Sequence, residues 1–272
     1  MKKLQFGVIG KGKLGSILMD RAEFVSINGD VTQPGTLSGH YRVVVNCAAI
    51  SSIDKCQDNH ATAVKVNAMG LKNLHEHYGA DVLNLGSEQI YPSRLFMPTE
   101  TTVPSPVNNY GITKVGAEAI SNAFMGKTIR LSRSVSVHDP DISEYLNKLK
   151  FGEQIHVPIY MMRSYLTRSQ VVDGIEFFAH HFDALPHIVN YGATTRFTYY
   201  KLVRDLAKVV GLNYRLVKPK WLPDTNLTPR PYFSGLDVSL AKSLGFPMYT
   251  PADTVSKLKE EYEQSLHSLT RA

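Results

Sequence analysis

Short apolar runs alternate with stretches of helical periodicity along this chain, and this alternation constrains the fold more than any other feature. Unbroken apolar runs are typical of strands that helices cover on both faces, and a strand–helix–strand order favours a parallel sheet. We therefore predict an α/β fold with a doubly wound parallel sheet. The predicted strands are 4–9, 24–27, 43–47, 82–85 and 128–131, and the predicted helices are 14–21, 59–77, 110–125, 170–180, 199–210 and 252–269. Thr198 is a predicted N-cap, Gly211 a predicted helix stop, and 218–233 a predicted long loop.

Size and composition narrow the class of protein. A chain of 272 residues with 43% apolar and 20% charged residues can bury the core of a globular protein. No apolar run reaches the length of a membrane span. The start, Met1-Lys2-Lys3, leads into a predicted strand and does not resemble a signal peptide. We expect a cytoplasmic protein without a membrane partner.

Charge and cysteine usage bear on the ligand. The net charge is +6, but Lys and Arg are scattered without a basic run. We therefore expect no nucleic-acid partner and favour an anionic ligand such as a dinucleotide or a nucleotide sugar. Cys47 and Cys56 are predicted to be free thiols. Neither these two residues nor the ten His have metal-ligand spacing, so we predict no metal site.

A glycine-rich turn joins the first predicted strand to the first predicted helix. The run Gly10-Lys11-Gly12-Lys13-Leu14-Gly15 has the spacing Gly-x-Gly-x-x-Gly in the context that a dinucleotide loop requires. Its glycines allow a tight turn, a close approach of backbone to pyrophosphate, and close packing of helix on strand. The N-terminus of the helix adds free N–H groups for phosphate. We expect these six residues to bind NADP(H) or NAD(H).

The coenzyme stays open between NADP and NAD at this stage. Lys11 and Lys13 favour a 2′-phosphate, but solvated lysines explain them equally well. Asp30 lies 20 residues after Gly10, near the position at which an acidic residue contacts adenosine, although an ordinary turn aspartate is the alternative. Only 14 residues separate Gly15 from Asp30, so we expect a short first crossover.

Tyr110 and Lys114 are the candidate catalytic pair. They are four residues apart at the start of a predicted helix, so their side chains share one face. A tyrosine can protonate the alkoxide that forms when a ketone accepts a hydride. Bringing a phenol from a pKa of ~10 to about 7 takes roughly 4 kcal/mol, part of which we expect from the Lys114 charge. A second pair, Tyr214 and Lys218, follows a short strand-like pattern and is predicted to be structural.

Further motifs follow these parts in order along nearly the whole chain. They are Val45-Asn46-Cys47-Ala48-Ala49, Ile53-Asp54-Lys55, Val66-Asn67-Ala68, Leu85-Gly86-Ser87-Glu88-Gln89-Ile90-Tyr91-Pro92, Arg133 with His138-Asp139-Pro140, Arg163-Ser164-Tyr165-Leu166 with Gln170-Val171-Val172, and Pro229-Arg230-Pro231 with Ser234-Gly235-Leu236-Asp237. This set resembles the extended short-chain dehydrogenase/reductases that act on nucleotide sugars, and among them the dTDP-4-dehydrorhamnose reductases. The chain departs from the family at its glycine turn, which is one residue short, and at Ser136, His138 and Asp139.

The resemblance implies a fold and a division into domains. The fold is Rossmann-like, with a smaller discontinuous C-terminal substrate lobe. Residues 1–137, with 166–190 returning to them, form the dinucleotide-binding domain. Residues 138–165 and 191–250 form the substrate lobe, and 251–272 form a C-terminal helix. A homodimer through the helix of Tyr110 and its neighbour is a further expectation, with a face that includes Val64, Ala68, Ile120 and Ala123.

The resemblance also implies roles for individual residues. Ser87 is expected to hydrogen-bond the substrate oxygen beside Tyr110 and Lys114, and a serine that caps backbone is the alternative. Further cofactor contacts are expected at Cys47, Ala48, Ala49, Asn67, Tyr110 and Lys114. Substrate contacts are expected at Glu88, Arg133, Arg163, Tyr165 and Arg230. For Arg163, Tyr165 and Arg230, packing at the surface or between lobes is an equal alternative.

Three functions fit these expectations. The first is an NAD(P)H-dependent reductase of a 4-keto-6-deoxy nucleotide sugar in carbohydrate biosynthesis. The second is a nucleotide-sugar epimerase, which keeps and cycles its cofactor. The third is a binding subunit with the same fold and no turnover. A 4,6-dehydratase is disfavoured, because Gln89 stands where that reaction uses an acidic residue.

Overall fold

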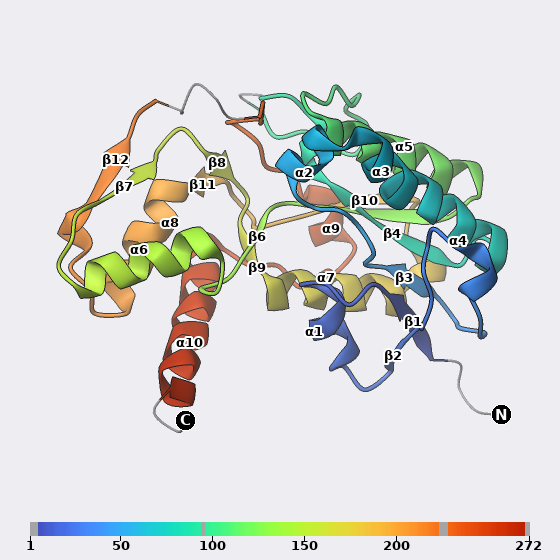
Figure 1. The fold of residues 1–272 in the computed structure, drawn as a ribbon, viewed down its shortest axis with the longest axis horizontal. Coiled ribbons are helices and arrows are strands. Elements are labelled where there is room, and N and C mark those ends of the chain that lie inside the picture. The colour runs from blue at the N-terminus through green and yellow to red at the C-terminus, as the bar shows by residue number, and fades with distance from the viewer. Residues whose placement is uncertain (1–4, 94–95, 223–227, 270–272) are drawn as a thin grey trace.

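The protein has two lobes of unequal size (Figure 1). The structure, a computed structural model, describes residues 5–93, 96–222 and 228–269. Three parts of the predictions lie outside the described residues: Leu4 in the first strand, 223–227 in the predicted loop, and 270–272 at the C-terminus. The larger lobe surrounds a sheet, and the smaller lobe consists of short strands and helices that include the C-terminal helix.

A six-stranded parallel sheet forms the centre of the larger lobe. Its order is β10 (Ile188–Tyr191), β5 (Lys127–Leu131), β4 (Val82–Ser87), β3 (Val44–Asn46), β1 (Phe6–Ile9) and β2 (Phe24–Ser26). The chain runs from β1 outward to β2 and then returns to β3, so the switch point lies between β1 and β3. The doubly wound Rossmann-like sheet is therefore confirmed.

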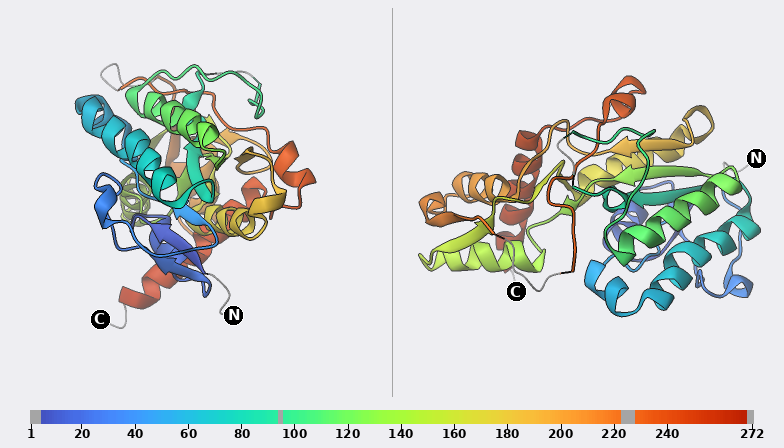
Figure 2. Two further views of the ribbon diagram at one scale, coloured as in Figure 1. Left: turned by 90° about the vertical axis from the view of Figure 1, so that its right-hand side faces the viewer. Right: turned by 90° about the horizontal axis from the view of Figure 1, so that it is seen from above.

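Helices cover both faces of the sheet (Figures 1 and 2). On one face lie α1 (Gly15–Met19) and α7 (Arg168–His180). On the other lie α2 (Ile53–Asp58), α3 (His60–Val64), the π-helical turn η2 (Lys65–Met69), α4 (Gly70–Tyr78) and α5 (Asn109–Ala123). The predicted helix 59–77 is thus two α-helical segments, α3 and α4, joined by the π-helical turn η2, and α2 was not predicted. The first crossover was expected to be short, and this is confirmed because both α1 and β2 are short.

The sequence patterns missed several elements of the structure, among them one strand of the central sheet and one helix of the smaller lobe. The edge strand β10 contains Asn190, which interrupts the apolar run; the side chain is buried and donates to the carbonyls of Pro98 and Asp237. Helix α6 (Pro140–Lys150) starts with a proline and buries Ile142, Leu146 and Leu149 along one stripe.

The smaller lobe is held by three short pairs of strands. These are β7 (Ile155–Pro158) with β12 (Val217–Lys220), β8 (Met162–Arg163) with β11 (Phe197–Thr198), and β6 (Ser134–Val135) with β9 (Leu166–Thr167). Around them pack α6, α8 (Tyr199–Val209) and α10 (Pro251–Leu269), whereas α9 (Ser239–Ser243) packs against β10 of the sheet. The 3-10 turns are η1 (Pro34–Thr36), η3 (Glu88–Ile90), η4 (Phe182–Ala184) and η5 (Tyr214–Leu216).

Two predictions in the C-terminal half were partly wrong. The strand-like segment around Tyr214 is the 3-10 turn η5, and the strand β12 follows it. Strand β12 therefore occupies the first part of the predicted loop 218–233. The ends of α8 were predicted correctly: Thr198 caps its start by accepting from the Lys201 amide at 3.1 Å, and Gly211 lies just past its end with φ +76°.

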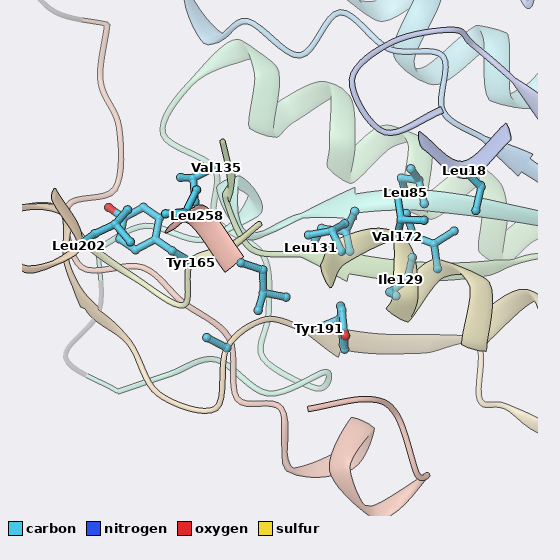
Figure 3. Packing of buried hydrophobic residues seen from close by; sticks show 14 of the residues in the cluster. Leu18, Leu85, Ile129, Leu131, Val135, Tyr165, Val172, Tyr191, Leu202 and Leu258 are labelled. Carbon is cyan, nitrogen blue, oxygen red and sulfur yellow. The ribbon is translucent and has the colours of Figure 1, made fainter. Parts of the chain in front are cut away.

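One apolar core runs through both lobes (Figure 3). It extends from Leu18 and Val172 beside the sheet, through Leu131 at the end of β5, to Tyr165 and Leu258 in the smaller lobe. Because this core is continuous, side chains from the smaller lobe have fixed positions relative to the ends of the strands.

Candidate active site

A cavity of about 430 Å³ collects most of the predicted site residues. It lies at the carboxyl ends of β3, β4 and β5, where doubly wound sheets bind ligands. The predicted residues that line it are Gly12, Lys13, Leu14, Cys47, Ala49, Ser87, Glu88, Tyr110, Lys114, Arg133, Arg163 and Arg230. The predicted residues outside its lining are Gly10, Lys11, Gly15, Asp30, Ala48, Asn67 and Tyr165.

The glycine turn has the shape of a cradle for an anion. Gly10 has φ +98°, and a Cβ there would lie 2.4 Å from the Ala48 nitrogen. A Cβ on Gly15 would lie 1.9 Å from the Gly10 oxygen. A Cβ on Gly12, in contrast, would meet nothing within 4 Å. The outer glycines therefore shape the turn, and Gly12 leaves open space toward the cavity, which fits the pyrophosphate of a dinucleotide.

The two lysines of the turn differ in their surroundings. Lys13 lines the cavity and pairs with Asp139 at 3.1 Å, a carboxylate that Arg168 also contacts. Lys11 is exposed, and its Nζ lies 3.5 Å from the Asn28 side chain.

Asp30 and Asn67 have local partners. Asp30 accepts from the backbone and the hydroxyl of Thr32, which is the turn arrangement that the sequence left as an alternative. Asn67 is buried and bonds both backbone groups of Ile50 as well as the Thr113 hydroxyl. Asn67 thus ties the loop after β3 to helix α5.

The segment after β3 contributes Cys47 and Ala49 to the cavity. Burial raises the pKa of the Cys47 thiol to about 12, so this residue acts as a small neutral wall group. Ala48 faces the glycine turn, and its amide donates to the Asn46 side chain at 3.1 Å.

Ser87, Tyr110 and Lys114 come together in the cavity. Ser87 ends β4, and its Oγ accepts from the Gln89 amide at 3.2 Å. Tyr110 and Lys114 occupy successive turns of α5, and the Lys114 Nζ lies 5.7 Å from the centre of the Tyr110 ring. The Lys114 ammonium donates to the Leu85 carbonyl at 2.8 Å. The start of α5 and the end of β4 thus converge at the cavity, and Tyr110 and Lys114 share one face of the helix.

The electrostatics differ from the expectation. Burial raises the pKa of Tyr110 to about 12, and the group that opposes this shift is the hydrogen-bonding Ser87 hydroxyl, not Lys114. Burial also lowers the pKa of Lys114 to about 8, so its amine remains mostly protonated at neutral pH. In the protein itself Tyr110 is therefore protonated at neutral pH, and Ser87 is its hydrogen-bond partner.

A buried ion pair stands beside Ser87. Glu88 and Arg163 are each 2% exposed and contact one another. The other Glu88 oxygen accepts from the Ser132 hydroxyl at 2.7 Å. Arg163 also donates to the Ser234 hydroxyl and the Pro231 carbonyl, each at 2.9 Å. Both side chains line the cavity, but their polar groups are largely engaged in joining the lobes.

The other predicted substrate contacts divide into two kinds. Tyr165 is fully buried against Phe197 and Tyr199 in the core, so its expected place at the site is wrong. Arg133 lines the cavity, pairs with Asp141 at 3.3 Å and stacks over Tyr199. Arg230 also lines the cavity and pairs with Asp54.

Several lining residues were missed by the sequence analysis. They include Asp54, Ser132, Ser134 and Met161. The signal that could have found the serines is their position directly after β5, because polar residues at the carboxyl ends of parallel strands face the ligand crevice. In the described part of the chain, no three His, Cys, Asp or Glu side chains gather as a metal site requires. Every helix among the described residues is too short or too polar to span a bilayer.

Known proteins provide independent comparisons. The family model of the RmlD substrate binding domain matches residues 29–157. A dTDP-4-dehydrorhamnose reductase of Mycobacterium tuberculosis is 30% identical over 135 residues, which cover 42% of this chain and 44% of the relative. This match spans less than half of that relative's length. The Escherichia coli enzyme of the same name is 25% identical over 256 residues, 82% of each chain.

The fold comparison covers nearly the whole molecule. A crystal structure of dTDP-4-dehydrorhamnose reductase from Bacillus anthracis in complex with NADP superposes with a TM-score of 0.83. The match covers 95% of this chain and 99% of that one at 17% sequence identity. The chain is thus similar in sequence to the RmlD substrate binding domain and to dTDP-4-dehydrorhamnose reductases, and it shares the fold of a solved structure of such a reductase.

Proposed function

We propose that the protein is an NAD(P)H-dependent reductase. Its substrate is a 4-keto-6-deoxy nucleotide sugar, like the substrates of dTDP-4-dehydrorhamnose reductases. The observation that carries this proposal is that the open side of the glycine turn and the Ser87, Tyr110 and Lys114 side chains share one cavity. The relatives named above support the same reaction.

The residues fit a dinucleotide cofactor. Gly12, Lys13 and Leu14 line the cavity where the pyrophosphate would lie, and Cys47 and Ala49 form the wall beside it. When bound, the reduced nicotinamide supplies a hydride to the keto carbon of the sugar. Of the two lysines in the glycine turn, Lys13 lines the cavity. A bound phosphate would compete with the Asp139 carboxylate for the Lys13 ammonium.

The remaining chemistry belongs to the side chains. Tyr110 holds its proton firmly at neutral pH and gives it to the substrate oxygen as negative charge develops there. The Ser87 hydroxyl, which is hydrogen-bonded to Tyr110, stabilises the same substrate oxygen. With the hydride on the keto carbon and the Tyr110 proton on its oxygen, the product would be an alcohol. Arg133 and Arg230 are cations at the cavity for the diphosphate of the substrate.

Dehydration is a poor fit to the same site. Gln89 is an amide that accepts from the Asn108 side chain at 3.3 Å, and Glu88 is paired with Arg163. Neither group is placed as a free acid or base next to Ser87.

The test is the loss of reduced nicotinamide, followed by its absorbance. Purified protein is mixed with NADPH or NADH and a panel of 4-keto-6-deoxy nucleotide sugars. Steady, substrate-dependent oxidation that stops in Tyr110→Phe would establish the reductase and name the coenzyme. Cofactor binding without net oxidation, together with conversion between sugar epimers, would instead establish an epimerase. Cofactor binding without either oxidation or epimer conversion would instead favour a non-catalytic binding subunit.

The four side chains predicted for a homodimer face differ in exposure. Ala68 is buried within the protein against α5, whereas Val64 and Ile120 are half-buried and Ala123 is exposed. The exposed apolar side chains on this side are Met69, Ile112 and Met125, and sedimentation of Ile112→Glu against the natural protein tests their role.

A further inference from the structure

An ion pair bridges two sides of the cavity. Asp54 lies on α2 of the larger lobe, and Arg230 lies in the segment 228–234, which returns from the smaller lobe. Both residues line the cavity. The Arg230 Nη2 donates to both carboxylate oxygens of Asp54, at 2.6 and 2.8 Å. Residues 176 positions apart in the sequence thus meet at the place where substrate would enter.

The backbone on each side of Arg230 is fixed. The Pro229 carbonyl accepts from the Asn108 side chain at 3.1 Å, and the Pro231 carbonyl accepts from Arg163 at 2.9 Å. The two prolines also restrict the backbone angle φ at their own positions. Because the chain is anchored before and after Arg230, a change at this residue is confined to its side chain.

Four cations that line the cavity are paired with a carboxylate, and the carboxylate that pairs with Arg230 is the most exposed of the four. The Asp54 side chain is 59% exposed, against 39% for the Asp141 partner of Arg133, 8% for Asp139 and 2% for Glu88. Hydrogen bonds from Arg230 and Thr228 lower the pKa of Asp54, so its carboxylate is charged at neutral pH. Ion pairs this exposed contribute little stability.

A diphosphate is a stronger partner for a guanidinium than a single carboxylate. It carries more negative charge and several oxygens that match the planar donor fork of arginine. A diphosphate in the cavity would therefore take Arg230 from Asp54.

We propose that Asp54 is a built-in competitor, which holds Arg230 across the cavity until the diphosphate of the nucleotide substrate displaces it. The proposal rests on the proposed function, because the incoming anion is the diphosphate of a nucleotide sugar. Asp54 keeps the guanidinium in place and reduces the affinity for nucleotide by the free energy of the pair that must break. The substrate thus makes its contact only by an exchange of anions.

The test measures dTDP binding by titration calorimetry, with no turnover required. We expect Asp54→Asn to bind dTDP about two- to fivefold more tightly than the natural protein, since an exposed ion pair no longer has to break. Arg230→Gln should bind about tenfold more weakly, because it loses hydrogen bonds to a charged group. In the double variant Asp54→Asn should add nothing to Arg230→Gln. Asp205→Asn removes a carboxylate paired with Lys201 on α8, outside the cavity lining, and controls for net charge.

Four outcomes would overturn the proposal. They are no dTDP binding by the natural protein, unchanged or weaker binding by Asp54→Asn, tighter binding that persists in the Arg230→Gln background, and equal tightening by Asp205→Asn. Arg230→Met, which also removes the charge, replaces Arg230→Gln if the latter does not fold. The reductase assay is separate: tighter dTDP binding by Asp54→Asn without any sugar reduction would uphold the exchange and reject the proposed reaction.

Discussion

Tyr110 is the residue on which the proposed reaction depends most directly. Its hydroxyl is a protonated acid in a partly buried site at the cavity, with Ser87 as hydrogen-bond partner. We expect Tyr110→Phe to lower kcat by about 10²- to 10⁴-fold, because the alkoxide then has no positioned proton donor. Cofactor affinity should stay within about twofold, since the ring remains in place. Steady-state kinetics and NADPH titration measure the two quantities. Tyr214→Phe alters the other Tyr-x-x-x-Lys pair, of which Tyr214 lies on η5 and Lys218 on β12, and should leave kcat unchanged. A near-normal rate in Tyr110→Phe would remove Tyr110 from the reaction.

At the same scale, His75 predicts a pH dependence of stability. Its ring is 1% exposed, stacks on Phe124, and bonds the Gly79 carbonyl through Nδ1. Burial lowers its pKa below 6.5. In the unfolded chain the ring takes up a proton near pH 6.5, whereas in the folded protein it does so only at lower pH. Stability is therefore complete above about pH 6.5 and falls below it, by at most ~1.4 kcal/mol per pH unit from this one group.

His75→Gln removes the titrating group, and comparison with the natural protein isolates its effect. We expect the difference in unfolding free energy between the two proteins to be constant at alkaline pH. Below about pH 6.5 it should move steadily in favour of the variant. Urea unfolding at a series of pH values measures it. A difference that does not change with pH would mean that His75 is protonated equally in both states.

At the scale of the element, helix α5 depends on its N-cap. The Asn108 Oδ1 accepts from the Gly111 amide at 2.8 Å, and its amide nitrogen donates to Pro229 and Gln89. Asn108→Ala removes the cap and the bridge, and should cost about 1–2 kcal/mol of unfolding free energy. Asn108→Ser retains an N-cap but loses the hydrogen bonds to Pro229 and Gln89. It should therefore recover most of the unfolding free energy that the cap contributes. Both should raise KM, because 228–234 loses an anchor. Equal stability for alanine and serine would show that the cap is unimportant.

The elements also show what sequence reasoning can reach. The glycine turn and the Tyr110–Lys114 pair were predictable because each depends on spacing within one strand end or one helix. The Glu88–Arg163 and Asp54–Arg230 pairs were not, because their members lie 75 and 176 residues apart. Tyr165 was expected at the site through the family resemblance, with packing between the lobes as the alternative, and the side chain packs in the core beyond the end of β8.

At the scale of the whole molecule, the buried Glu88–Arg163 pair joins the two lobes. Glu88 follows the last residue of β4, and Arg163 ends β8 and reaches the segment 228–234. The apolar core already holds the lobes together, so the pair specifies how they meet at the cavity. A buried ion pair adds little net stability, but removal of one partner leaves an uncompensated group in the interior.

This asymmetry gives a prediction for a double-mutant cycle. We expect Glu88→Gln and Arg163→Met each to cost about 3–5 kcal/mol of unfolding free energy, whereas the double variant costs much less than their sum. Urea unfolding followed by circular dichroism measures all four proteins. Glu76→Gln, in the exposed Lys72–Glu76 pair of α4, serves as control and should cost less than about 0.5 kcal/mol. Additive costs would mean that the two residues act independently. Strong coupling would mean that Ser87 and the segment of Arg230 are held in register by one buried contact between the lobes.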